Sequence, residues 1–138
     1  MAAAVAGHLH HVQSLSTLLA VRDKTITGCV SGHGLSEFYA VLTRAPFAPP
    51  IYPLEAWRII SANVIPNFEM MNLTPEIYRE TIESCANHGW LDGRIYYALH
   101  PSCARHAACD RMHTLNVRHF QQLAPDLADR IGAPSSFL

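Results

Sequence analysis

Two residues of this chain have side chains and neighbours suited to binding a metal ion or a phosphate. Glu37 lies in an apolar stretch beside Leu35, Phe38 and Val41. A carboxylate is unusual among apolar residues, so its presence there points to a functional role. Asn116 follows a short β-like segment, and its side-chain carbonyl can accept a hydrogen bond from a metal-bound water while its amide orients a phosphate. Two plainer interpretations stay open, a solvated helix-surface carboxylate for Glu37 and an Asn that caps a turn into residues 117–120 for Asn116.

Basic and aromatic residues accompany these two positions. Arg94 opens an apolar helical segment, and Arg118 and His119 follow Asn116 directly. A planar guanidinium suits phosphate recognition, so these three residues are candidates for RNA contact. Simple solvation at the surface is the alternative for each of them.

Other ligand-type residues have less suitable spacing. They are the histidines His8, His10 and His11, the residues Cys103, His106 and Cys109, and the acids Asp92 and Asp110. The three histidines lack a Cys or an acid at ligand spacing, so we interpret them as surface residues. Cys103 is expected to pack in a helix, and both acids are expected in solvated loops.

The elements that would carry these residues alternate between helical and strand-like patterns. Helices are predicted at 8–19, 35–43, 53–64, 75–87 and 94–108, strands at 25–31, 68–73 and 111–114, and an irregular tail from Leu123 with a turn at 125–130. Thr74 is a suitable N-cap, and Gly89 a suitable C-terminal stop, for the fourth helix. Strands separated by helices predict an α/β fold with a parallel sheet.

Buried faces are predicted for two of these helices. Leu9, Val12, Leu15 and Leu19 share one face of the first helix, and Ile95, Leu99 and Cys103 form the expected buried stripe of the fifth.

Composition limits the class of protein. The 138 residues are 49% hydrophobic and 15% charged, which predicts a single globular domain over residues 1–138. A formal net charge of −1 excludes a strongly basic nucleic-acid binder, although a local basic groove remains open. No apolar run approaches the length of a membrane span, and the four cysteines form no Cys-x-x-Cys pair, so we expect a reduced, cytoplasmic protein.

Three motifs resemble one known family. LSEFYAVLTR at 35–44, GRIYYALH at 93–100 and DRMHTLNVRHF at 110–120 resemble PIN-domain proteins, in particular VapC-type toxin ribonucleases. The resemblance covers roughly residues 2 to 131. It implies a three-layer α/β/α fold with a parallel sheet that lacks the first, central strand, since Ala2–His11 is similar to what normally follows that strand. The chain is therefore expected to be N-terminally truncated relative to the family.

The resemblance also implies a chemistry. The family cleaves RNA with Mg²⁺ or Mn²⁺ ions held by three or four acids at the carboxyl ends of parallel strands. Glu37 and Asn116 match two of these positions, whereas Tyr97 stands where the family motif has Asp. A phenol is neutral at neutral pH and is a poor Mg²⁺ ligand. The chain is therefore expected to bind these ions weakly or not at all and to be inactive or truncated as a nuclease.

Two other outcomes are open beside an inactive nuclease. The alternative function is a non-catalytic PIN-like protein that binds an antitoxin or RNA, and the third outcome is a chain that does not fold stably. By resemblance, the expected partners are an antitoxin protein, an RNA substrate and a second copy of the chain. Glu37, Tyr97 and Asn116 are expected to face one cleft, because the ends of parallel strands converge on one edge of a sheet.

Overall fold

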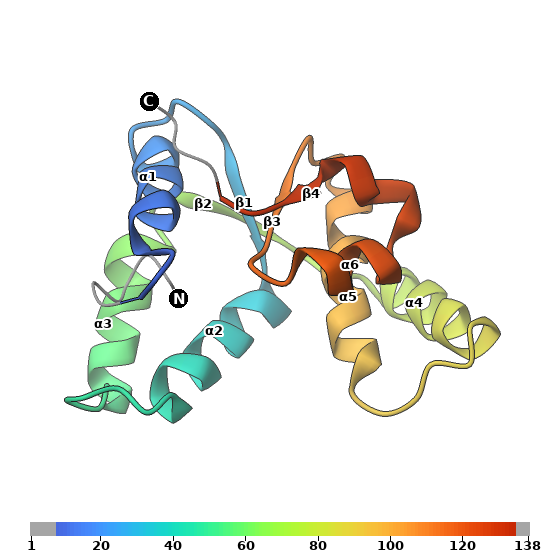
Figure 1. Cartoon of the computed structure of the whole chain (residues 1–138), viewed down its shortest axis with the longest axis horizontal. Helices are drawn as coiled ribbons and strands as arrows, with labels where there is room; N and C mark the ends of the chain where they lie inside the picture. The colour runs from blue at the N-terminus through green and yellow to red at the C-terminus, as the bar shows by residue number, and fades with distance from the viewer. Residues whose placement is uncertain (1–7, 135–138) are drawn as a thin grey trace. The chain divides into compact units, whose positions relative to one another are not determined.

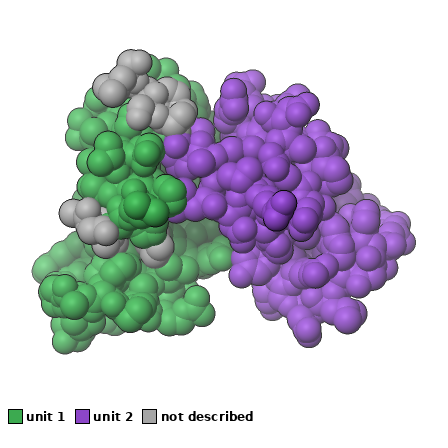
Figure 2. Space-filling view, viewed as in Figure 1, with its two compact units in different colours: residues 1–70, 135–138 green, residues 71–134 purple. Residues whose placement is uncertain are grey.

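The computed structural model describes residues 8–134, which form a mixture of helices and short strands (Figure 1). They fall into two compact units, the first reaching to Met70 and the second covering Met71–Pro134 (Figure 2). The α/β class is confirmed at this level. The single domain over residues 1–138 and the three-layer arrangement stay predictions. Most of Ala2–His11, the segment expected to follow a missing first strand, lies outside the described residues.

Within the described residues, the first unit contains three helices and two strands, the second of which ends at the boundary with the second unit. In chain order they are α1 (His11–Arg22), β1 (Gly28–Ser31), α2 (Gly32–Arg44), α3 (Pro53–Asn63) and β2 (Phe68–Met71). The two strands are neighbours in a two-stranded sheet. Their order matches the sequence prediction, although each strand is shorter than predicted and α1 begins and ends three residues later.

The core of the first unit lies between α2 and α3 and is apolar. Leu42, Ala56 and Ile60 are buried there, with Leu42 and Ala56 at 0% exposure. Pro53 occupies the first turn of α3, where a missing N–H costs nothing. The Glu55 carboxylate accepts a 2.9 Å hydrogen bond from the backbone N–H of Tyr52, which stabilises the start of α3.

Gly28 allows α1 to approach the sheet closely. A Cβ atom at this position would lie 2.6 Å from Cγ1 of Val21 and 2.8 Å from the ring of Phe68. Val21 is itself buried, at 2% exposure. The predicted apolar face of α1 is wrong at its N-terminal end, because Leu9 and Val12 are 88% and 72% exposed whereas the helix buries Ala20 and Val21.

The second unit contains three α-helices, one 3₁₀ helix and two short strands among the described residues. They are α4 (Pro75–Asn87), α5 (Arg94–His106), β3 (Met112–His113), α6 (Val117–Leu123), η2 (Pro125–Arg130) and β4 (Ile131–Gly132). β3 and β4 pair in parallel, with Met112 opposite Ile131. The turn predicted at 125–130 is the 3₁₀ helix, whereas α6 replaces the short turn expected after Asn116.

Local signals set the ends of α4 as predicted. The Thr74 hydroxyl accepts a hydrogen bond from the backbone N–H of Ile77 at 3.4 Å, and Pro75 fills the first helical position. Gly89 follows the helix with φ of 64°, the left-handed conformation that glycine adopts at low cost.

The face that α5 buries is rotated from the predicted one. Leu99 is buried as expected, but Ile95 and Cys103 are only half-buried, and Ala98, Pro101 and Ser102 are buried in addition. The cause is packing against α4, where the Thr81 hydroxyl lies 2.9 Å from the hydroxyl of Ser102. Because Thr81 and Ser102 are 3% and 8% exposed, their hydrogen bond compensates the burial of both groups.

A second apolar cluster supports the C-terminal part of this unit. Its buried members are Phe120, Leu123, Ala124, Leu127 and Ile131. Beside it, the Arg105 guanidinium donates to both carboxylate oxygens of Asp126 at 2.7 and 2.6 Å. These bonds hold the pKa of the Asp126 carboxyl below its usual value.

No helix in the described part of the chain combines the length and the apolar character that a bilayer crossing requires.

Candidate functional site

The helix α2 positions Glu37, the acid singled out in the sequence. Ser31 caps the helix, because its hydroxyl accepts a 2.9 Å hydrogen bond from the backbone N–H of Gly34. This cap fixes the first turn, which contains His33, and Glu37 follows one turn later. Side chains four residues apart lie on the same face of a helix.

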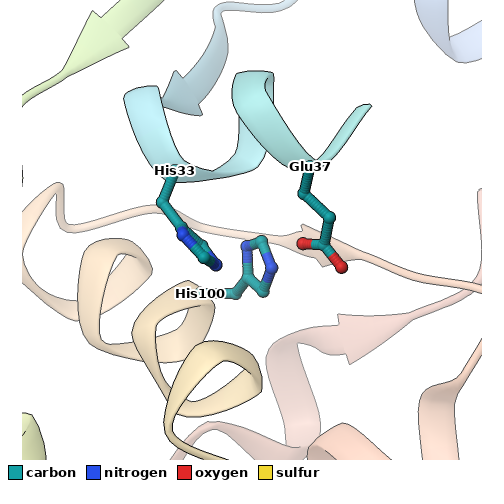
Figure 3. A group of neighbouring side chains, drawn as sticks. All are labelled: His33, Glu37 and His100. Atoms are coloured by element: carbon teal, nitrogen blue, oxygen red, sulfur yellow. The ribbon is translucent and has the colours of Figure 1, made fainter. Parts of the chain in front are cut away.

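His33 and Glu37 form a pair of neighbouring metal-ligand side chains in the first unit. Both project from the same side of α2 (Figure 3), and one ring nitrogen of His33 lies within 4.8 Å of a carboxylate oxygen of Glu37. Both residues are half-buried, and the Nε2 atom of His33 is buried. The third residue labelled in the figure, His100, belongs to α5 in the second unit.

Sequence reasoning found Glu37 and missed His33. The signal was present, since a His and a Glu four residues apart in a helical pattern share a face. A magnesium-type site directs attention to acids, because hard divalent ions prefer oxygen ligands. An imidazole beside a carboxylate indicates a different group of metals, those that accept nitrogen together with oxygen.

Tyr97 lies in an aromatic cluster of the second unit. Its ring contacts His119 edge-on with 5.1 Å between ring centroids, and Phe120 with 6.2 Å. Tyr97 remains 42% exposed, whereas Phe120 is buried. The structure therefore brings together two of the sequence candidates, Tyr97 and His119, through the favourable edge-to-face geometry of aromatic rings.

Asn116 occupies the N-cap position of α6. Its own backbone N–H donates to the Thr114 hydroxyl at 3.1 Å, and its side chain makes no capping hydrogen bond. The residue is exposed. Asn116 therefore stands at the helix entry that the capping interpretation predicted, but its side chain does not cap the helix.

The candidate RNA-binding arginines are both exposed in the second unit. Arg94 is the first residue of α5, and Arg118 lies in the first turn of α6. The predicted cleft formed by Glu37, Tyr97 and Asn116 joins residues of both units and stays a prediction.

The remaining ligand-type residues have local roles. The His8 ring accepts a 3.1 Å hydrogen bond from the backbone N–H of His10. His106 contacts the Ser102 carbonyl through Nδ1 at 2.9 Å, and its Nε2 lies 3.4 Å from a carboxylate oxygen of Glu80. Asp92 and Asp110 are exposed, as the sequence predicted.

A small pocket opens between α4 and α5. Its volume is about 120 Å³, and Trp90 and Leu123 line it together with Glu80 and His106. Sites for drug-sized ligands occupy roughly 300–1,000 Å³, so this pocket accommodates at most one side chain or a few waters.

Comparisons of the chain with models of protein families, with curated proteins and with solved structures gave no match.

Proposed function

We propose that this chain is a PIN-like protein of the VapC type that does not cleave RNA with Mg²⁺ or Mn²⁺. The three motifs support the PIN-like part of this proposal, and Tyr97 supports the loss of activity. The phenol of Tyr97 replaces a carboxylate and is engaged with the rings of His119 and Phe120. A neutral ring in this position neither balances the charge of a divalent ion nor supplies a ligand of the type Mg²⁺ prefers.

The available donors near Glu37 also differ from a magnesium site. Mg²⁺ requires oxygen ligands in octahedral geometry. The neighbour of Glu37 on α2 is instead the imidazole of His33, which offers a nitrogen. The residues described therefore do not fit the hard ion that the resemblance implies.

The test of this proposal is an RNA cleavage assay with a gain-of-function arm. The wild-type chain should cleave a labelled single-stranded RNA no faster in Mg²⁺ or Mn²⁺ than in EDTA. Tyr97→Asp restores the family acid and should raise Mg²⁺ affinity, whereas the neutral control Tyr97→Asn should not. EDTA-sensitive cleavage by the wild-type chain that disappears in Glu37→Gln would contradict the proposal.

A second candidate function is RNA binding without cleavage. The observation that favours it is the exposure of both Arg94 and Arg118 in the second unit. Each phosphate contact contributes to affinity and makes it depend on salt, so Arg94→Ala and Arg118→Ala should each weaken binding of a labelled RNA and flatten its salt dependence. Arg79→Ala, at an exposed position of α4, is the matched control. An equal loss of RNA affinity in all three variants would show that any surface arginine contributes. That result would refute an RNA-binding surface formed by Arg94 and Arg118.

The remaining parts of the proposal rest on resemblance. An antitoxin protein and a second copy of the chain are the proposed protein partners, and the cytoplasm is the proposed location. A pull-down with the chain as bait and light scattering of the purified protein test the two partners separately.

A further inference from the structure

The pair His33 and Glu37 on α2 carries an inference that the family resemblance does not supply. We propose that these two side chains are ligands of one transition-metal ion of the zinc type. Both side chains belong to α2, so such a site would exist whether or not the chain binds or cleaves RNA. Zinc is also a different class of metal from the Mg²⁺ or Mn²⁺ that a nuclease of this family uses.

The positions of the two side chains suit a single ion. A His nitrogen and a carboxylate oxygen each bind zinc at about 2.0–2.2 Å, so two ligand atoms of a tetrahedral ion lie roughly 3.4 Å apart. The donor atoms of His33 and Glu37 lie within 4.8 Å of each other, and both belong to one helix. Small rotations of the side chains therefore bring both atoms to bonding distance without moving the backbone.

The helix supports this geometry before a metal arrives. The Ser31 cap holds the first turn of α2, and Leu42 anchors the second half of the helix in the apolar core of the first unit. Ligands on a rigid element lose little conformational freedom when an ion binds, which favours affinity.

The donor types select the metal. Imidazole nitrogen is a ligand for Zn²⁺, Co²⁺, Ni²⁺ and Cu²⁺, whereas Mg²⁺ takes oxygen ligands and keeps much of its water. Two protein ligands leave further positions on a tetrahedral zinc ion for water or other donors. His33 and Glu37 are both half-buried, so a metal bound between them is partly withdrawn from solvent and each metal–ligand interaction is stronger.

Another His–carboxylate pair of the chain serves as a control. His106 and Glu80 lie 3.4 Å apart on two different helices of the second unit, with side chains 42% and 54% exposed. They have the same chemical groups at a spacing that also suits zinc, but their side chains are more exposed and belong to two separate helices. If donor type and spacing alone decided metal binding, this pair would compete with the pair on α2.

The experiment titrates the full-length chain with Co²⁺, follows its visible d–d absorption, and then displaces Co²⁺ with Zn²⁺. We expect saturable binding, displacement by Zn²⁺ and no displacement by millimolar Mg²⁺. His33→Ala and Glu37→Gln should each weaken Zn²⁺ binding at least about tenfold, because losing even an outer-sphere partner of a metal site costs roughly 10–100-fold. His106→Ala and Glu80→Gln should bind Zn²⁺ as the wild type does.

Three results would overturn the proposal: no saturable binding by the wild type, unchanged affinity in both α2 variants, or a loss that follows His106 instead of His33. Glu37→Gln keeps the size of the side chain, so it remains informative if His33→Ala does not fold, which circular dichroism reports. The RNA assay in Mg²⁺ is a separate measurement. Its failure leaves the zinc titration unaffected, and the reverse also holds.

Discussion

In the first unit the α2–α3 interface buries Leu42, Ala56 and Ile60, whereas in the second unit the α4–α5 interface buries a hydrogen-bonded pair of hydroxyls, Thr81 and Ser102. An apolar interface depends on volume and shape, and its stability falls in proportion to the atoms removed. A buried polar pair depends on its partners: the Thr81 hydroxyl also donates to the backbone carbonyl of Ile77 at 2.7 Å, whereas the buried Ser102 hydroxyl that loses Thr81 is left without compensation for the water it has lost. The two units should therefore respond differently to single substitutions.

The same contrast extends to the residues with functional interest. In the first unit a histidine and an acid project from one helix, where they are suited to a metal ion. In the second unit the position at which the family resemblance expects an acid is an aromatic ring packed on His119 and Phe120. The helix α2 therefore presents metal-ligand side chains, whereas α5 presents an aromatic ring that packs against other rings.

The largest expected effect is in the apolar interface of the first unit. Leu42→Ala should lower the free energy of unfolding by about 2–5 kcal/mol, because Leu42 is 0% exposed and its loss leaves a cavity. Urea unfolding followed by circular dichroism measures this change. The control Leu54→Ala, at a position of α3 that is 59% exposed, should cost less than about 0.5 kcal/mol. If both variants lowered the free energy of unfolding equally, the apolar α2–α3 interface would not be what stabilises the first unit, and the contrast with the polar interface of the second unit would be lost.

An intermediate effect is expected from the polar pair of the second unit. Thr81→Val should cost about 1–3 kcal/mol, because the Ser102 hydroxyl stays buried and loses Thr81 as its partner. Adding Ser102→Ala removes the stranded hydroxyl, so the double variant should recover part of that loss. The measurement is urea unfolding of the two single variants and the double variant. Costs that simply add in the double variant would show that the two hydroxyls are not energetically coupled.

The smallest effect is a dependence of stability on pH. Partial burial lowers the pKa of His113 below 6.5, a hydrogen bond with the backbone of Ala133 opposes this, and the charge of Arg111 lowers the pKa further. Below pH 6.5 the unfolded chain therefore binds a proton at this position that the folded chain does not yet bind. Stability should fall as the pH drops from 6.5 towards the lower folded pKa, and this contribution should level off beneath it.

Unfolding free energies of the wild type and of His113→Gln between neutral and mildly acidic pH measure this contribution. The other histidines titrate in both proteins, so only the difference between the two curves reports on His113. The variant should lose less stability on acidification than the wild type. Parallel curves would mean that His113 has the same proton affinity in the folded and unfolded chain.

The sequence by itself determined the features that depend on near neighbours. The helices α2, α3, α4 and α5 lie where the hydrophobic periodicity predicted them, within a few residues at each end. Thr74, Pro75 and Gly89 set the ends of α4 because caps act through hydrogen bonds and backbone angles only a few residues away. The proximity of His33 and Glu37 was also readable, since helical geometry alone puts residues four apart on one face.

Only the tertiary structure decided which faces are buried and which side chains are partners. The buried face of α5 includes Ser102 because α4 presents Thr81 to it, and α1 buries its C-terminal residues because Gly28 admits Val21 against the sheet. The resemblance singled out Tyr97 as standing where the family motif has Asp, but its contact with His119 depends on α6, a helix that the pattern did not predict. Partners distant in sequence are selected by how the elements pack, and hydrophobic periodicity along one helix contains no information about the helix that will cover it.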